Sequence, residues 1–460
     1  MDILTALAKI TGPKHLITGE ATTRYAHDAT GKYCADPIAV VRPADTGQVS
    51  AIVRLANQTK TPIVPVSGNT GLVGGTYADG AILISLERLN TIHEIRPEAR
   101  IAIVGAGTII ATLQEAVEDH NLIFPLLFGA RGSAMIGGAL STNAGGSNVL
   151  RYGNTRALCL GVEVVTPTGE VMNLMSELHK DNSGYDLKDM LIGAEGTLGI
   201  ITAAVLKLFP KPCAYATAMV AVPTLNEALS LLNRLQNETA GAVEAFEYMP
   251  ASYMKMHKDH FPDRRLPFDT NYDVNILVEA ATTSPNMQVQ DILETTLGEM
   301  LQDGLVLDAV IAQNEAQRAE MWERRESAAE VVFALNPRLD SDICVALDKL
   351  PAFLEQVAPR IARLDPQAYT SSVAHLGDGN IHYSVHPGRD DKQLMGQFME
   401  EIEDVVRSLG GSFSAEHGVG LSKRPSMARR KDAVALGMMR QIKTALDPNN
   451  IMNPGKVLPD

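Results

Sequence analysis

The sequence predicts an α+β protein of two or three domains, on the strength of three observations. The chain has 460 residues, which exceeds the usual size of a single domain. Its composition, 45% hydrophobic, 20% charged and 5% aromatic, is typical of a folded protein and not of a disordered or fibrous one. Glycine-rich loops alternate with β-branched runs and helical segments in the first half, whereas helices and strands with few glycines alternate in the second.

The first half combines short strands with amphipathic helices. Helical periodicity predicts one helix over 45–58, which begins at a cap formed by Asp45 or Thr46. A second helix is predicted over 108–121, beginning at Thr108. Runs of β-branched residues predict strands at 38–41, 81–86 and 161–167.

The second half begins after the proline-bracketed stretch 207–212, where we expect a domain boundary. A charged helical segment over 314–335 leads to two strand-like runs, 369–375 and 381–386, separated by the turn sequence LGDGN. This pattern predicts a β-hairpin. Further elements are a helix over 225–238 and a strand over 274–280.

Both ends of the chain carry local signals. Residues 447–460 are rich in Pro, Asn and Gly, and we expect this tail to lie against the body in one conformation. Residues 2–10 predict a short helix packed on its own domain, with a helix that touches a membrane as the alternative.

Charge and cysteine content exclude several functional classes. With 40 Lys and Arg against 54 Asp and Glu, the net charge of -14 argues against nucleic acid as a partner. The four cysteines, Cys34, Cys159, Cys213 and Cys344, form no CxxC pair, which fits a reducing compartment. No apolar run reaches the roughly 18 to 20 residues of a membrane span. We therefore expect a cytoplasmic protein, peripheral at most at the inner face of a membrane. We also expect a homodimer, because this is the commonest oligomeric state of proteins in general.

Three segments of the first half carry more glycine than turns alone require: 67–75, 129–146 and 193–201. Glycine admits positive φ and lets backbone N–H groups approach a ligand closely, which suits pyrophosphate oxygens. Each segment alone predicts only a tight turn, but the concentration of three such segments in one domain indicates a large anionic cofactor. None matches GxxxxGK[ST] or a clean GxGxxG, so P-loop and Rossmann sites are weak interpretations.

The chain also contains a series of longer motifs, in this order: PVSGNTGLVGG, GARGSAMIGGALSTNAGGSNVLRYG, KDNSGYDLKDMLIGAEGTLGIIT, HLGDGNIH, EHGVG and NPGK. In this order they resemble the FAD-linked D-2-hydroxyacid dehydrogenases of the vanillyl-alcohol oxidase and p-cresol methylhydroxylase (PCMH) superfamily, nearest the D-2-hydroxyglutarate and D-lactate dehydrogenase branch. The resemblance implies a PCMH-type FAD-binding domain of two subdomains, followed by an α/β cap domain. The implied bounds are 1–36 for an N-terminal segment, 37–212 for the FAD domain, 213–410 for the cap and 411–460 for a segment returning to the FAD domain.

The resemblance also implies which residues hold FAD, and because the first glycine loops contain neither His nor Cys, we expect the FAD to be non-covalent. The pyrophosphate is assigned to Ser67, Gly68, Asn69, Thr70, Gly71, Leu72, Gly74 and Gly75. The flavin and its ribityl chain are assigned to Gly132, Ser133, Gly137, Gly138, Thr142, Gly145 and Gly146, the adenosine half to Glu195, Gly196, Gly199 and Ile201, and the ring also to Asn453.

Two histidines and a glutamate suggest a metal site. His375 and His382 stand at the two ends of the hairpin turn, and Glu416 is followed directly by His417. Two His and one Glu leave a fourth position open, as in catalytic zinc sites. Spacing alone is a moderate signal, since a single histidine is usually a hydrogen-bonded structural residue. The resemblance assigns His375, His382 and Glu416 to a divalent metal, which we expect to be zinc, and His417 to the general base, with His386 as a supporting residue.

The implied reaction is oxidation of a D-2-hydroxy acid to the 2-oxo acid. The metal polarises the hydroxyl, His417 takes its proton, and a hydride passes from C2 to flavin N5. Electrons then leave to a quinone or an electron-transfer flavoprotein. The alternatives are an FAD-linked alcohol or glycolate-type oxidase that uses oxygen, a metal hydrolase and a flavin-binding sensor.

Substrate recognition is the least determined part of the sequence. Arg325 matches the family's carboxylate-binding arginine. Its neighbour Arg324 points about 100° away on a helix, so we expect one of the two to be a solvated surface charge. Lys423 matches another basic position of the family. Asp340 stands where the hydroxyglutarate branch has a lysine, and Ser384 where it has an asparagine, so D-lactate, D-malate and D-2-hydroxyglutarate all stay open.

Overall fold

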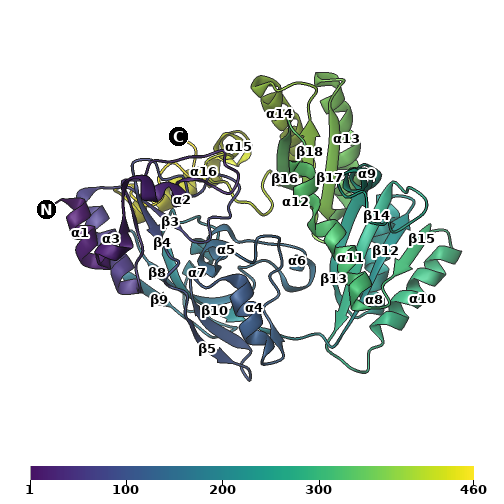
Figure 1. Ribbon diagram of the computed structural model, residues 1–460, viewed down its shortest axis with the longest axis horizontal. Helices are drawn as coiled ribbons and strands as arrows, with labels where there is room; N and C mark the ends of the chain where they lie inside the picture. The colour runs from purple at the N-terminus through teal and green to yellow at the C-terminus, as the bar shows by residue number, and fades with distance from the viewer. Residues whose placement is uncertain (1) are drawn as a thin grey trace. The chain divides into compact units, whose positions relative to one another are not determined.

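The computed structural model describes residues 2–460 as two compact units (Figure 1). Unit 1 comprises Met1–Gly145, Gly153–Lys211 and Glu416–Asp460. Unit 2 comprises Gly146–Tyr152 and Pro212–Ala415. The glycine-rich segments therefore fall almost entirely in unit 1, and the predicted histidine hairpin falls in unit 2. Within the described residues, no helix combines the length and the apolar character that crossing a membrane requires.

Unit 1 starts with a small mixed sheet of strand order β1-β2-β4-β3, in which β2, β4 and β3 run parallel. The predicted helix cap is confirmed, because the Asp45 carboxylate accepts the Gln48 N–H at 2.8 Å at the start of α3. The predicted N-terminal helix is also present, with Leu7 fully buried. The elements are α1 (Ile3–Thr11), β1 (Leu16–Ile17), α2 (Thr23–Ala26), β2 (Ala39–Val41), α3 (Thr46–Thr59), β3 (Ile63–Val66) and β4 (Ile82–Ser85).

A five-stranded antiparallel sheet of order β5-β6-β10-β8-β9 forms the second part of unit 1. The predicted helix start at Thr108 is wrong, because α4 begins at Ile110. The Thr108 carbonyl accepts the Ile136 N–H at 3.0 Å and Ile109 forms a bridge with Met135, so this stretch is extended. The elements are β5 (Ile92–Arg96), β6 (Ile101–Gly105), α4 (Ile110–Glu118), β7 (Leu122–Ile123), α5 (Ile136–Thr142), β8 (Cys159–Val165), β9 (Val171–Leu174), α7 (Leu187–Leu191), β10 (Ile200–Lys207) and β11 (Phe209–Pro210).

Unit 2 is built on one antiparallel seven-stranded sheet of order β15-β12-β14-β13-β17-β18-β16. The predicted hairpin is confirmed as β17 and β18, which pair over their full length. The strands are β12 (Ala214–Val222), β13 (Val243–Pro250), β14 (Val274–Thr282), β15 (Asp308–Ile311), β16 (Leu339–Cys344), β17 (Tyr369–His375) and β18 (Asn380–His386).

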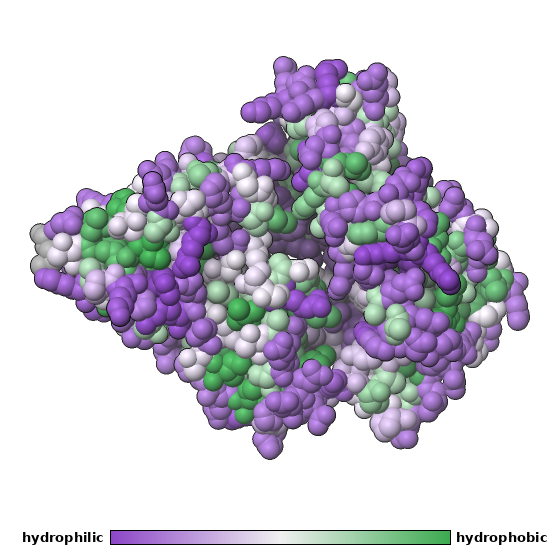
Figure 2. Space-filling model, in the orientation of Figure 1, coloured by the Kyte–Doolittle hydropathy of each residue, from purple (hydrophilic) through white to green (hydrophobic). Residues whose placement is uncertain are grey.

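Helices cover both faces of this sheet. One face packs against α8, α10, α13 and α14, and in Figure 1 α13 and α14 lie beside β16–β18 while α8 and α10 lie beside β12. The other face packs against α9, α11 and α12. Hydrophilic side chains cover the outer ends of α13 and α14 in Figure 2, as their amphipathic sequences require. The bounds are α6 (Val149–Tyr152), α8 (Leu225–Glu238), α9 (Ala251–His260), α10 (Val289–Gln302), α11 (Glu315–Glu326), α12 (Ala328–Phe333), α13 (Leu350–Leu364) and α14 (Lys392–Ser408).

The last segment of unit 1 contains α15 (Arg424–Arg430) and α16 (Ala433–Leu446), followed by the turn-rich tail. The tail lies against the first sheet, since Met452 bridges Ile63 and the Asn453 N–H donates to the Ile63 carbonyl at 2.8 Å. Further along, the Val457 N–H donates to the Gly420 carbonyl at 2.9 Å. The tail therefore has a defined path along unit 1.

Candidate functional site

The loop after β3 presents a row of backbone donors. The N–H groups of Gly68 to Thr76 donate to no acceptor within residues 2–460, although Val73 and Gly74 are buried. Buried backbone donors are almost always satisfied, so this row requires a ligand or water as its acceptor. Asn69 and Gly74 have positive φ values of 53° and 68°, which turn successive N–H groups toward a common side. The loop therefore fits the pyrophosphate of a dinucleotide.

Close backbone contacts fix this loop against the second glycine segment. A Cβ at Gly68 would lie 2.2 Å from the Ser133 carbonyl oxygen, and one at Gly138 would lie 3.3 Å from the Ser67 Cβ. A Cβ at Gly137 would lie 2.8 Å from the Ala106 Cβ. The first and third of these distances are too short for any side chain, so glycine is required at Gly68 and Gly137. The close approaches bring the loop from Ser67, the Ser133 turn and α5 together.

Glu195 joins four segments of unit 1. Its buried carboxylate accepts the N–H groups of Val419 at 2.7 Å and Gly420 at 2.8 Å, and its own N–H donates to Ser141. Its carbonyl accepts from the Asn453 side chain at 2.7 Å, and the same amide group donates to Gly75 at 3.0 Å. Burial raises the pKa of Glu195, while the two backbone donors oppose the shift. The EHGVG segment is thus fixed to the glycine loops by this carboxylate.

The other predicted FAD residues occupy defined places in unit 1, except one. Gly196 and Gly199 pack against Pro65 and Val164, and Ile201 is a core residue of β10. Thr142 donates to the Gly138 carbonyl within α5. Gly145 ends the first segment of unit 1, and Gly146 begins the short segment that belongs to unit 2. The contacts of all the predicted FAD residues with the cofactor stay predictions, including those of Asn69, Thr70, Gly71, Leu72, Gly132, Gly145, Gly146 and Asn453.

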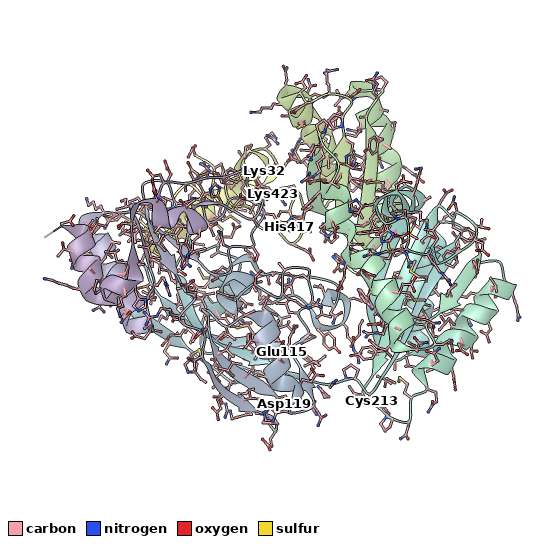
Figure 3. The ribbon with its side chains drawn as sticks, viewed as in Figure 1. Lys32, Glu115, Asp119, Cys213, His417 and Lys423 are labelled. Carbon is pink, nitrogen blue, oxygen red and sulfur yellow. The ribbon has the colours of Figure 1, made fainter. Side chains whose placement is uncertain are left out.

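The hairpin brings the two predicted metal histidines together. The imidazole rings of His375 and His382 are 5.4 Å apart between centroids. Next to this hairpin, β16 pairs with β18 so that Asp342 lies opposite His382. The Ala415 N–H donates to the Asp342 carbonyl at 3.2 Å, and Glu416 and His417 follow directly in the chain. In Figure 3, His417 and Lys423 lie on the segment that precedes α15.

One group of side chains has the composition of a divalent metal site. Asp342 and His382 lie opposite each other in the sheet of unit 2, and Glu416 and His417 follow Ala415 in the chain. Each of the four side chains offers one ligand atom that a metal ion could bind. Two imidazoles and two carboxylates are suitable donors for a transition metal such as zinc. The group includes Asp342, which the sequence did not indicate, and it does not include His375.

His375 instead belongs to a buried triad with Glu247 and Arg325. The His375 Nδ1–H donates to the Glu247 carboxylate at 2.8 Å, and the Arg325 Nε donates to the same carboxylate at 2.7 Å. The second Arg325 nitrogen lies 3.5 Å from His375 Nε2. Burial would raise the pKa of Glu247, but the charges of His375 and Arg325 outweigh it and lower the pKa. In this arrangement both ring nitrogens of His375 face protein groups, and its metal role stays a prediction.

Arg324 and Arg325 are both buried, with 3% and 8% of their surface exposed. The expectation that one of them is a solvated surface charge is therefore wrong. Arg324 donates to the Arg265 carbonyl at 2.6 Å, because the loop after α9 covers this side of α11. Arg325 faces the sheet, where it meets Glu247. Only Arg325 adjoins the histidine hairpin.

A second polar group lies further along β16 and β18. Ser384 donates to Asp340 at 2.9 Å, and Arg338 donates to the other oxygen of Asp340 at 2.8 Å. Because strand residues two apart share a face, this group lies about 7 Å along the sheet from Asp342 and His382. His386, on the same face, is buried, with its Nε2 3.2 Å from the Ser371 hydroxyl oxygen. Arg338 thus adds a cation that the sequence did not indicate.

Lys423 belongs to the segment of unit 1 that carries EHGVG. Its N–H donates to the Val419 carbonyl at 3.1 Å, and its positive charge acts to lower the pKa of Glu195. It therefore lies close to the residues that fix this segment, and its contact with a substrate stays a prediction.

The comparisons with known proteins agree on the architecture. Residues 37–175 match the family model described as FAD binding domain, and residues 211–457 match FAD linked oxidases, C-terminal domain. The solved structure of p-cresol methylhydroxylase with substrate bound has a TM-score of 0.76 at 16% identity, covering 100% of this chain and 96% of that one. The solved structure of alkyldihydroxyacetonephosphate synthase has a TM-score of 0.76 at 18% identity, covering 99% of this chain and 86% of that one. These two likenesses concern the fold alone.

Curated relatives extend the match over nearly the whole chain. D-2-hydroxyglutarate dehydrogenase of Stutzerimonas stutzeri is 33% identical over 96% of this chain and 96% of the relative. The mitochondrial D-2-hydroxyglutarate dehydrogenase of Bos taurus is 35% identical over 91% of this chain and 76% of the relative. The donor row after β3, the buried arginine triad beside the histidine hairpin and these matches lead to one conclusion. The chain belongs to the FAD-linked D-2-hydroxyacid dehydrogenases of the vanillyl-alcohol oxidase and p-cresol methylhydroxylase superfamily, and it is an FAD-dependent dehydrogenase.

Proposed function

We propose that this protein oxidises a D-2-hydroxy acid to the 2-oxo acid with the help of a divalent metal, and passes the electrons to a quinone or an electron-transfer flavoprotein. The observation that carries the proposal is the Arg325–Glu247–His375 triad beside His382. It supplies a buried, fixed guanidinium next to metal-type donors, which is the arrangement a 2-hydroxy carboxylate needs.

The protein residues divide the work of binding and proton transfer. Arg325 holds the substrate carboxylate, and Glu247 keeps the guanidinium in one orientation. Asp342, His382, Glu416 and His417 are the donors available to a divalent metal. When bound, FAD would serve as the hydride acceptor and the metal as a Lewis acid for the substrate hydroxyl. An imidazole titrates near neutral pH, so His417 suits removal of the hydroxyl proton when it is not engaged as a ligand.

Arg338, Asp340 and Ser384 are the residues that we expect to meet the far end of the substrate. Their distance along the sheet, about 7 Å from the donor group, corresponds to the length of a C4 or C5 acid. Asp340 balances the charge of Arg338, so a second carboxylate on the substrate gains less here than at a free cation. D-2-Hydroxyglutarate, D-malate and D-lactate are therefore the acids to compare first, with D-2-hydroxyglutarate favoured by the curated relatives.

Anaerobic flavin reduction tests this proposal. The purified protein is titrated with the D- and L-enantiomers of the three acids while flavin absorbance is followed, with and without prior treatment with a chelator. We expect one D-acid to bleach the flavin and the chelator to slow this strongly. Reduction that is indifferent to the chelator removes the metal from the proposal, and a flavin that no 2-hydroxy acid reduces overturns it. Rapid peroxide formation in air supports the oxidase alternative.

A further inference from the structure

Lys456 is a buried lysine without an acidic partner. Its side chain belongs to a residue with 6% of its surface exposed, and Nζ donates to the Pro454 carbonyl at 3.1 Å. No carboxylate within residues 2–460 forms a salt bridge with it. Burial lowers the pKa of Lys456 to about 8, and the positive charge of Arg424 contributes to the shift. A buried ammonium that faces another cation is costly unless an anion compensates it.

The tail directs this ammonium to the loop after β3. Lys456 Nζ lies 5.8 Å from the centre of the Tyr77 ring, directly after the row of unsatisfied N–H groups that ends at Thr76. Two hydrogen bonds hold the tail there, one from the Asn453 side chain to the Gly75 carbonyl and one from the Val457 N–H to the Gly420 carbonyl. Lys456 is therefore fixed beside the donor row from both sides.

Two independent features thus require the same kind of ligand. The loop offers N–H donors without acceptors, and Lys456 offers a buried positive charge without a counter-ion. Backbone amides and an ammonium together are the usual environment of a phosphate group. A neutral ligand would satisfy the amides and leave the charge uncompensated.

We propose that Lys456 is the counter-cation of the FAD pyrophosphate bound by the Gly68–Thr76 loop. This inference rests on the proposed function, which requires FAD. The proposal gives the C-terminal tail a second residue that binds the cofactor, Lys456, in addition to Asn453. It also makes FAD affinity depend on the protonation of this one lysine. The charged and titratable groups around it are Arg424, which pairs with Asp460, and the phenols of Tyr77 and its neighbour Tyr33.

The test measures FAD release from the holoprotein by the rise in flavin fluorescence after dilution, at pH 7 and at pH 9.5. The variants are Lys456→Met, Lys456→Arg and, as a matched control, Lys431→Met at an exposed lysine of the same segment. We expect Lys456→Met to weaken FAD binding about tenfold or more at pH 7, and Lys456→Arg and Lys431→Met to bind as the wild type does. At pH 9.5 the wild type weakens by about tenfold, because the neutral amine cannot pair with phosphate, whereas Lys456→Arg stays unchanged.

Competition experiments assign the effect to the phosphates. ADP carries the pyrophosphate and adenosine does not, so Lys456→Met weakens competition by ADP and leaves competition by adenosine unchanged. Equal FAD affinity of Lys456→Met and wild type overturns the inference, as does an identical pH dependence of wild type and Lys456→Arg. If Lys456→Met does not fold, the Lys456→Arg comparison decides alone. A wild type that binds no FAD at all contradicts the proposed function instead.

Discussion

Removing the Glu247 carboxylate is the sharpest test of the site. Glu247 is fully buried in β13 and accepts from both Arg325 and His375. In Glu247→Ala the guanidinium stays buried without a counter-charge, which costs about 3–5 kcal/mol of stability. Glu247→Gln keeps an oxygen for one donor but loses the negative charge, at about 1–3 kcal/mol. Both variants also release the arginine from its fixed orientation, and misplacement of about 1 Å costs roughly 100-fold in rate.

The assay combines urea unfolding with anaerobic flavin reduction. The control is Glu279→Gln, at a second buried glutamate of the same sheet that accepts from Arg318 at 2.6 Å and from Trp322 at 2.8 Å. Both changes lower the free energy of unfolding. Only the change at Glu247 raises KM for the hydroxy acid and slows flavin reduction, because only this carboxylate orients Arg325. Wild-type KM and reduction rate in Glu247→Ala would refute the assignment of Arg325 to the substrate.

Three further predictions concern the remaining parts of the site. Asp340→Asn removes the negative charge beside Arg338, which leaves this arginine free to attract the second carboxylate of D-2-hydroxyglutarate. The ratio of kcat/KM for D-2-hydroxyglutarate to kcat/KM for D-lactate should therefore rise about fivefold. An unchanged ratio means that the far end of the substrate binds elsewhere. Asp342→Ala removes a metal donor and should lower zinc content after dialysis, whereas Asp348→Ala, at an exposed aspartate, should not. For the protein without FAD, the free energy of unfolding of the wild type relative to that of Lys456→Met should increase by about 3 kcal/mol between pH 8 and 10.5, as measured by urea unfolding. In this range the folded lysine, with its pKa of about 8, has lost the proton that the unfolded chain still binds, so a rise in pH favours the folded state.

Local signals explain how much of the fold could be predicted from the sequence. The helix over 225–238 is α8 with the same bounds, because its apolar periodicity and its Thr224 cap are both local. The hairpin followed from alternation around a glycine turn. The start of α4 could not be predicted, because the bridge between Ile109 and Met135 competes with helix formation, and such pairing leaves no mark near Ile109.

The candidate site was predictable where motifs are contiguous and not where sheet pairing builds it. His382, Glu416 and His417 stand in short motifs, and they reappear in one group of donors. Asp342 joins them only through the register between β16 and β18, which the sequence does not display. Glu247 does have a signal in the sequence, because the strand VEAFEYMP is apolar except for two glutamates, Glu244 and Glu247, and a carboxylate buried in a strand must have a partner.

The glycines of unit 1 serve two physically different purposes, which the motifs alone do not separate. A Cβ at Gly68 or Gly199 would lie within 2.7 Å of neighbouring atoms of the chain, so these glycines are required by packing. A Cβ at Gly71 or Gly132 would meet nothing within 4 Å. At these two positions the fold tolerates a side chain, and the space beside the backbone is therefore available to a ligand. Alanine at the first pair should destabilise the protein with or without FAD, whereas alanine at Gly71 should leave stability unchanged and weaken FAD binding, since this residue lies within the unsatisfied donor row.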